Sequence, residues 1–257
     1  MSARDRATAR GRLLSLLVQF AFLAILLLFW YLATTVWGVS RILLPNPLDV
    51  WHQLVGVVAS GAFIPDLKVT LGELAAAFAI STTLGVSLGY LISRSRYLIK
   101  VFEPLLAAIY AIPIILFLPL YVLMLGLGPN SKIALGATIS FFPIVLSTIA
   151  GFGHVDRRFV TAARSMGAND LQMFRHVLLP AALPVILAGL RMGFTVALLS
   201  VIASETIASF AGLGHRIVDL AENMDTARMF AYIVFVIVIV AFLNAVVSKL
   251  EGRARWR

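Results

Sequence analysis

The most restrictive feature of this sequence is a series of long apolar runs that contain few or no charges. The runs at about residues 13–37 and 133–152 are examples. About 18 or more consecutive apolar residues are typical of a helix that crosses a bilayer, because such a helix satisfies its own backbone hydrogen bonds. Of all residues, 61% are hydrophobic and 13% are charged, whereas soluble domains have roughly 45–50% apolar and 25% charged residues. These numbers exclude a soluble globular protein and predict an all-α, polytopic membrane protein.

Six transmembrane helices are predicted from the apolar runs and from the glycines, prolines and charges that end them. They lie at about residues 13–37, 68–93, 101–125, 133–152, 181–204 and 229–248. Pro113 and Pro119 lie within the third helix and Pro143 within the fourth. Proline removes a backbone hydrogen bond, which is tolerated where neighbouring helices or water satisfy the freed carbonyl. Between the first two helices, an amphipathic piece around Val50 to Val58 predicts an extramembrane loop with interfacial character.

The basic residues predict the orientation of the chain. When alternate loops are assigned to opposite sides, fifteen of the 21 Lys and Arg residues fall on one side, together with both termini. By the positive-inside rule this side is cytoplasmic. We therefore expect a cytoplasmic N-terminal tail at residues 1–12, one transmembrane domain at 13–250 with a long interior loop at 153–180, and a basic cytoplasmic tail at 251–257. Because the charges lie at helix ends, the net charge of +9 reflects membrane topology and not binding of nucleic acid. Cysteine is absent, which excludes disulfides and thiolate chemistry.

The interior loop is predicted to form two short helices. Asp156 can cap the first helix, whose apolar residues recur at 159, 162, 163 and 166. Gly167 ends it, and Asn169 or Asp170 can cap a second helix that runs through Val177. Small residues would then form the cytoplasmic surface of a docking knob. An amphipathic hairpin on the lipid surface is the alternative.

The same loop resembles a known family. Thr161-Ala162-Ala163, Gly167, Val177 and Leu179-Pro180 have the spacing of the EAA motif, E-A-A-x3-G-x9-I-x-L-P, of binding-protein-dependent ABC importer permeases. Thr161 replaces the glutamate and Val177 the isoleucine. Further motifs are similar to the nitrate, sulfonate, taurine and bicarbonate branch, among them Leu44-Pro45-Asn46-Pro47, Glu103-Pro104-Leu105-Leu106, Gly189-Leu190-Arg191-Met192-Gly193, Ala203-Ser204-Glu205 and Gly212-Leu213-Gly214.

The resemblance implies the transmembrane-domain fold of a type I ABC importer, in which the loop is the coupling helix of the ATPase contact. The residues that it assigns to coupling are Arg157, Thr161, Ala162, Ala163, Ser165, Met166, Gly167, Ala168, Val177, Leu179 and Pro180. The implied partners are two cytoplasmic ATPase subunits, a periplasmic solute-binding protein, a second copy of the chain and membrane lipid, in a bacterial inner membrane. The chain would bind no cofactor, because ATP and Mg²⁺ belong to the ATPase.

The resemblance also implies that the third, fourth and fifth helices line the solute pathway. Candidate lining residues are Tyr110, Phe117, Ser140, Phe141, Arg191, Thr195, Ser200 and Glu205. The branch suggests a small anion such as nitrate, a sulfonate, taurine or bicarbonate, with a pyrimidine or vitamin precursor as the alternative.

Particular residues suggest two alternative functions. An ion-coupled secondary transporter would need carboxylates near the midplane, whereas Glu73 and Glu103 are predicted near helix ends. An intramembrane serine protease would use Ser87 in Gly85-Val86-Ser87-Leu88-Gly89, which matches G-x-S-x-G. That motif needs a strand-to-helix turn and a histidine partner, so small-residue helix packing is the expected role of this pair of glycines. No nucleotide-binding or zinc-protease motif occurs, and we expect no enzymatic activity in this chain.

Overall fold

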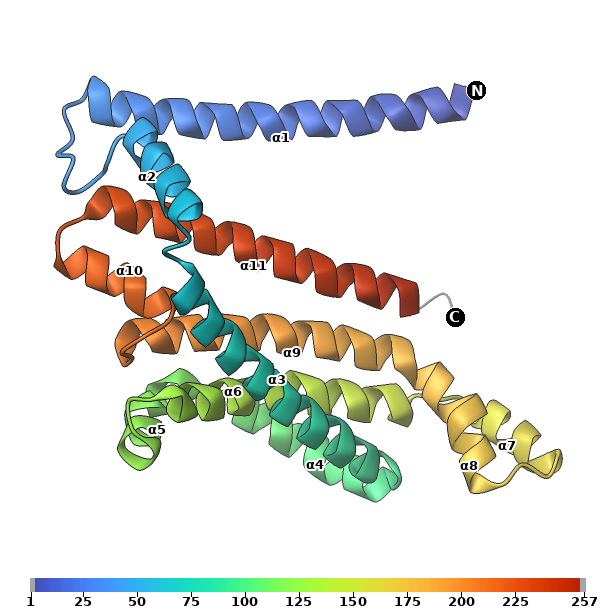
Figure 1. The fold of residues 1–257 in the computed structure, drawn as a ribbon. Helices are drawn as coiled ribbons and strands as arrows, with labels where there is room; N and C mark the ends of the chain where they lie inside the picture. Colours follow the sequence, from blue (N-terminus) through green and yellow to red (C-terminus); the bar gives the residue numbers. More distant parts are fainter. Residues whose placement is uncertain (1–2, 255–257) are drawn as a thin grey trace. The chain divides into compact units, whose positions relative to one another are not determined.

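The computed structural model describes the backbone of residues 3–254 and the side chains of residues 17–156, 158–249, 251 and 252. The ends of the two predicted tails and the side chain of Arg157 lie outside the described residues. The helices, in chain order and as labelled in Figure 1, are α1 (Ala3–Thr35), α2 (Pro47–Ser60), α3 (Ile64–Ser93), α4 (Arg96–Tyr110), η1 (Ile114–Phe117), α5 (Leu118–Leu125), α6 (Pro129–Gly153), α7 (Arg157–Ser165), α8 (Asp170–Met173), η2 (Phe174–Leu178), α9 (Leu179–Ile207), α10 (Leu213–Glu222) and α11 (Thr226–Ala254).

The predicted spans are confirmed over the described residues, but the third and the fifth differ in form from the prediction. Over the described residues, five helices are long and apolar enough to cross a membrane, and there are six if α4 and the segment of η1 and α5, which are bent by 70°, are counted together as one span. The predicted continuous helix at 101–125 is therefore wrong. The helix stops ahead of Pro113, which has no N–H to donate and disfavours helical geometry at Ile112. By contrast, α6 continues through Pro143.

The fifth predicted helix also differs from the structure. Instead of starting at residue 181, the helical chain runs from Asp170 through the π-helical turn η2 into α9. Pro180 lies in the first turn of α9 and has no backbone N–H to donate. The wide π-helical turn η2 directly precedes this first turn. The segment after Gly167 is consequently one continuous helical connection into a membrane span.

Two compact units make up the chain, one of residues up to Ala62 together with Ile217–Phe235, and one of Phe63–Arg216 together with the chain from Val236. In the first unit, the Trp30 indole donates to the Pro45 carbonyl at 3.0 Å. This bond ties the loop after α1 back onto that helix. The predicted amphipathic piece around Val50 to Val58 is confirmed as α2, whose Asn46 side chain caps the first turn.

The second unit is built around α6, which packs against α3 and α9 (Figure 1). Glycines allow the close approach. A Cβ on Gly85 or Gly89 of α3 would overlap Ile144 or Thr148 of α6. These two glycines are buried whereas Ser87 is exposed, so the Gly85–Gly89 motif is a small-residue packing surface, as expected, and not a nucleophile turn. Gly189 of α9 makes an equally close contact with α6.

Candidate functional site

The interior loop has the two-helix form that the sequence predicts. The Asp156 carboxylate accepts from the Arg158 backbone N–H at 2.8 Å and starts α7. Gly167 has a φ of +80°, and the N–H of Ala168 donates to the Ala163 carbonyl at 3.0 Å, a hydrogen bond typical of a glycine-terminated helix. Asn169 then forms a capping box that starts α8. These local bonds define a rigid hairpin, residues 156–178.

The hairpin presents small and apolar side chains at its surface. Phe159 is 62% exposed and Met166 is 84% exposed. The other predicted coupling residues are exposed (Thr161, Ala162, Ser165, Gly167 and Pro180) or half-buried (Ala163, Ala168, Val177 and Leu179). Apolar side chains that find no partner within the hairpin are suited to a protein contact.

An aromatic cluster that the sequence did not indicate joins the hairpin to the helix bundle. The Tyr90 ring of α3 lies with its centroid 5.1 Å from both Phe152 of α6 and Phe174 of η2. Met173 beside them is buried. Edge-to-face aromatic contacts of this kind hold packed elements in a fixed relation. A displacement of the hairpin would therefore be passed to α3 and α6 as well as to α9.

A buried polar network ties the end of α9 to α3. The Glu205 carboxylate accepts from the Thr70 hydroxyl at 2.7 Å and from the Gly214 N–H at 2.8 Å. The Leu213 N–H in turn donates to the Thr70 oxygen at 3.0 Å. Gly212, with a φ of +107°, has no room for a Cβ because the Glu205 carboxylate occupies that space. The network therefore fixes the turn between α9 and α10.

Two more buried ionisable side chains lie beside this network, and the sequence did not identify either as part of a site. Glu73 of α3 and Lys132 of α6 are both buried and interact electrostatically with Glu205. The Lys132 ammonium donates to the carbonyls of Leu127 and Gly128 at the start of α6. Lys132 directly precedes the predicted span 133–152, and Glu73 is predicted near the end of the span 68–93. Both contribute instead to a cluster that connects α3, α6 and α9.

The remaining predicted pathway residues are spread over the second unit. Ser140 and Ser200 are buried and donate to carbonyls four residues earlier, Gly136 and Val196, at 2.7 Å. Arg191 pairs with Glu251 at 3.3 Å and the Thr195 hydroxyl contacts the Asn244 amide oxygen at 2.7 Å, so both join α9 to α11. Two of these four side chains therefore bond within their own helix, and two bond to α11.

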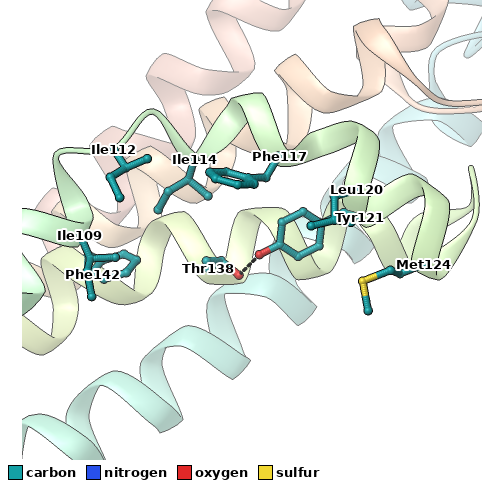
Figure 2. Close-up of a pocket in the computed structure, with 9 residues that line it drawn as sticks. All are labelled: Ile109, Ile112, Ile114, Phe117, Leu120, Tyr121, Met124, Thr138 and Phe142. Carbon is teal, nitrogen blue, oxygen red and sulfur yellow. Dashed lines mark hydrogen bonds between the residues drawn. The ribbon is translucent and has the colours of Figure 1, made fainter.

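Three aromatic residues of the predicted set do lie together. Tyr110 of α4 stacks on Phe142 with ring centroids 5.7 Å apart, and Phe141 lies 5.4 Å from the same ring. Phe117 and Phe142 line a cavity of about 380 Å³ between the bent span and α6 (Figure 2). The residues that line the cavity are Ile109, Ile112, Ile114, Phe117, Leu120, Tyr121, Met124, Thr138 and Phe142.

Comparison with known proteins identifies the family. The family model described as "binding-protein-dependent transport system inner membrane component" matches residues 81–256. The chain belongs to this family. The permease is 32% identical to the taurine transport system permease protein TauC of Escherichia coli (strain K12) over 226 residues, 86% of this chain and 82% of TauC. It is 31% identical to the riboflavin transport system permease protein RibX of Chloroflexus aurantiacus over 236 residues, 91% of this chain and 88% of RibX.

Solved structures support the fold of the permease. One chain of the inward-facing methionine ABC transporter MetNI matches with a TM-score of 0.65 at 17% identity, over 75% of this chain and 95% of that chain. The fold is therefore that of a type I ABC importer transmembrane domain. The chain is a multi-pass ABC importer permease subunit of the branch that includes taurine and sulfonate permeases.

Proposed function

We propose that the chain is the membrane-spanning subunit of an ATP-driven importer whose partners are two cytoplasmic ATPase subunits and a periplasmic solute-binding protein. The observation that carries this proposal is the hairpin at residues 156–178. It has exposed apolar and small side chains, such as Met166 and Ala162, and it continues without a break into the α9 span. A partner that binds the hairpin and displaces it would move the α9 helix directly.

The proposed mechanism is a rocking motion of two copies of the chain. Closure of the ATPases on ATP would draw the two hairpins together, and the aromatic cluster of Tyr90, Phe152 and Phe174 would pass this displacement to α3 and α6. The helix bundles would then change from inward-open to outward-open, so that solute released by the binding protein enters. The chain itself supplies no chemistry to this cycle.

The proposed location is the bacterial inner membrane, with the hairpin and both termini on the cytoplasmic side. The charge distribution supports this orientation, because the side that carries the hairpin has fifteen of the 21 Lys and Arg residues. Reactivity of introduced cysteines toward a membrane-impermeant reagent tests it, since the natural chain has no cysteine. A cysteine at Ser165 should react only after the membrane is opened, whereas one at Ser40 should react in intact cells.

Gly167→Trp is expected to abolish binding of the ATPase and solute uptake while leaving membrane insertion intact. The indole would stand on the exposed tip of the hairpin, where a partner must approach closely. Gly38→Trp is the matched control, because Gly38 also has a positive φ, of +65°, and open space around its Cβ position, but lies in the loop after α1. Both substitutions carry a backbone strain of about 1–2 kcal/mol, so a difference between them reports on the contact.

The measurement is purification of the tagged chain from its native membrane in mild detergent, followed by native mass spectrometry of the co-purifying subunits. We expect one ATPase per copy of the chain for the natural protein and for Gly38→Trp, and none for Gly167→Trp. Normal uptake by Gly167→Trp would contradict the coupling role. A lone oligomer without an ATPase would instead favour ion-coupled secondary transport, for which Glu73 and Glu205 are buried carboxylates among the described residues.

A further inference from the structure

The cavity beside α6 is formed at the break in the third span. The chain leaves the helix after Tyr110 and resumes at Ile114, and Ile112 and Ile114 on either side of Pro113 both line the cavity. Irregular backbone within an apolar span is tolerated where it is buried in protein or lines a cavity, and interrupted helices form solute sites in many transporters. The volume of about 380 Å³ falls within the roughly 300–1,000 Å³ of small-molecule sites.

The lining of this cavity is apolar and uncharged, and three of its nine side chains are aromatic. Figure 2 shows Phe117, Tyr121 and Phe142 around it, and none of the described residues that line it carries a charge at neutral pH. A sulfonate or nitrate that entered would lose its hydration without gaining a cation, which is costly in an apolar environment. A flat ring would gain stacking contacts with the aromatic side chains. The lining therefore favours planar, uncharged solutes over anions.

One polar pair within the cavity adds a preference for a solute that donates a hydrogen bond. The Tyr121 hydroxyl lies 2.8 Å from the Thr138 hydroxyl, and the Thr138 hydroxyl donates to the Ala134 carbonyl at 2.8 Å. Because Thr138 has a single hydroxyl proton, Tyr121 is the donor in their mutual bond. The Tyr121 oxygen then keeps an acceptor site for a group that enters the cavity. A solute that carries an N–H or amino group would satisfy it.

We propose that this cavity receives the transported solute and that the solute is an uncharged, planar nitrogen heterocycle with an N–H or amino donor. The inference rests on the proposed import function and narrows its solute class. Sequence identity does not distinguish an anionic solute from a heterocycle, because the chain is about equally similar to a taurine permease and to a riboflavin permease. The uncharged lining with its three aromatic rings and the Tyr121 acceptor decide in favour of the heterocycle.

Tyr121→Phe tests the acceptor, because this substitution removes a single oxygen and keeps the ring. Uptake of radiolabelled riboflavin, an aminopyrimidine and taurine is measured in a strain that lacks the natural chain and carries each variant. We expect uptake of at least one heterocycle, lowered about 3- to 10-fold by Tyr121→Phe, as for the loss of one hydrogen bond. Tyr97→Phe is the matched control, because Tyr97 is 74% exposed and does not line the cavity.

A second pair of variants tests the stacking contact. Phe117→Leu should lower heterocycle uptake about 2- to 10-fold, whereas Phe102→Leu, at a partly exposed ring outside the cavity, should not. The amount of each variant in the membrane and its recovery with the ATPase show that folding and assembly are unchanged. Loss of uptake with normal assembly then reports on the solute contact.

The outcomes separate the solute class from the import function. Chain-dependent uptake of taurine, absence of chain-dependent uptake of either heterocycle, or heterocycle uptake that Tyr121→Phe leaves unchanged would overturn the proposed solute class. Heterocycle uptake that survives Gly167→Trp would overturn ATPase-coupled import, while the solute class would stand on the Tyr121 and Phe117 effects.

Discussion

Gly189→Val is expected to remove most of the folded permease from the membrane. A Cβ at this position of α9 would overlap the Ser147 side chain of α6 and lie 3.2 Å from the Pro143 carbonyl. The obstacle includes backbone of a helix that is packed on its other side against α3, so α6 has little freedom to move away. Overpacking of this kind typically costs about 1–3 kcal/mol, and contact with backbone raises the cost. The loss should appear as a lowered unfolding midpoint of the purified protein and a reduced yield after size-exclusion chromatography.

Gly72→Val is the matched control for this substitution. Gly72 lies in α3, and nothing lies within 4 Å of its Cβ position, so the same added side chain should change the stability by no more than about 0.5 kcal/mol. Equal unfolding midpoints for Gly189→Val and Gly72→Val would contradict the close packing of α6 and α9.

The spans and the hairpin could be predicted because the signals that specify them are local. An apolar run identifies a span without knowledge of its neighbours. In the hairpin, each cap joins atoms within a few residues, such as Asp156 with Arg158 and Asn169 with Gln172. The residue types that make these bonds are few, so their spacing alone indicated where α7 and α8 begin.

The break in the third span could not be located from the sequence, because proline has different effects in different surroundings. The helix stops ahead of Pro113, whereas α6 continues through Pro143 and α9 through Pro184. Neighbouring helices decide whether the lost hydrogen bond is tolerated, and a single sequence does not show which helices are neighbours. The cavity that depends on this break was missed for the same reason.

The hydrogen-bond partners of Glu205 could not be predicted from the sequence either. Thr70 lies 135 positions away along the chain, and an isolated threonine in an apolar run is most simply a residue that bonds to its own helix. Ala203-Ser204-Glu205 and Gly212-Leu213-Gly214 are separate motifs in the sequence, and nothing in their spacing shows that the carboxylate holds the glycine turn. Only the fold brings these groups together.

Replacement of Glu205 should separate the role of its hydrogen bonds from the role of its charge. In Glu205→Leu, the buried Gly214 N–H loses its acceptor, at roughly 1–3 kcal/mol for a buried group left without a partner, and the Thr70 hydroxyl keeps only the Asp66 carbonyl, 3.2 Å away. We therefore expect a lowered unfolding midpoint and faster hydrogen exchange of the Gly214 amide. Glu222→Leu, at an exposed glutamate of α10, should leave both measurements unchanged.

Glu205→Gln should behave nearly as the natural protein. The glutamine oxygen can accept from the Gly214 N–H, and its amide can donate to the Thr70 oxygen once the Thr70 hydroxyl donates to the Asp66 carbonyl, 3.2 Å away. The Gly214 N–H, the Leu213 N–H and the Thr70 hydroxyl then each keep an acceptor, although the carboxylate charge beside Glu73 and Lys132 is gone. Slow exchange of the Gly214 amide in Glu205→Gln and fast exchange in Glu205→Leu would assign the stability of this turn to its hydrogen bonds. Equally fast exchange of the Gly214 amide in the two variants would assign the stability of the turn to the charge of Glu205. The cluster with Lys132 would then be the element that holds α9 against α3.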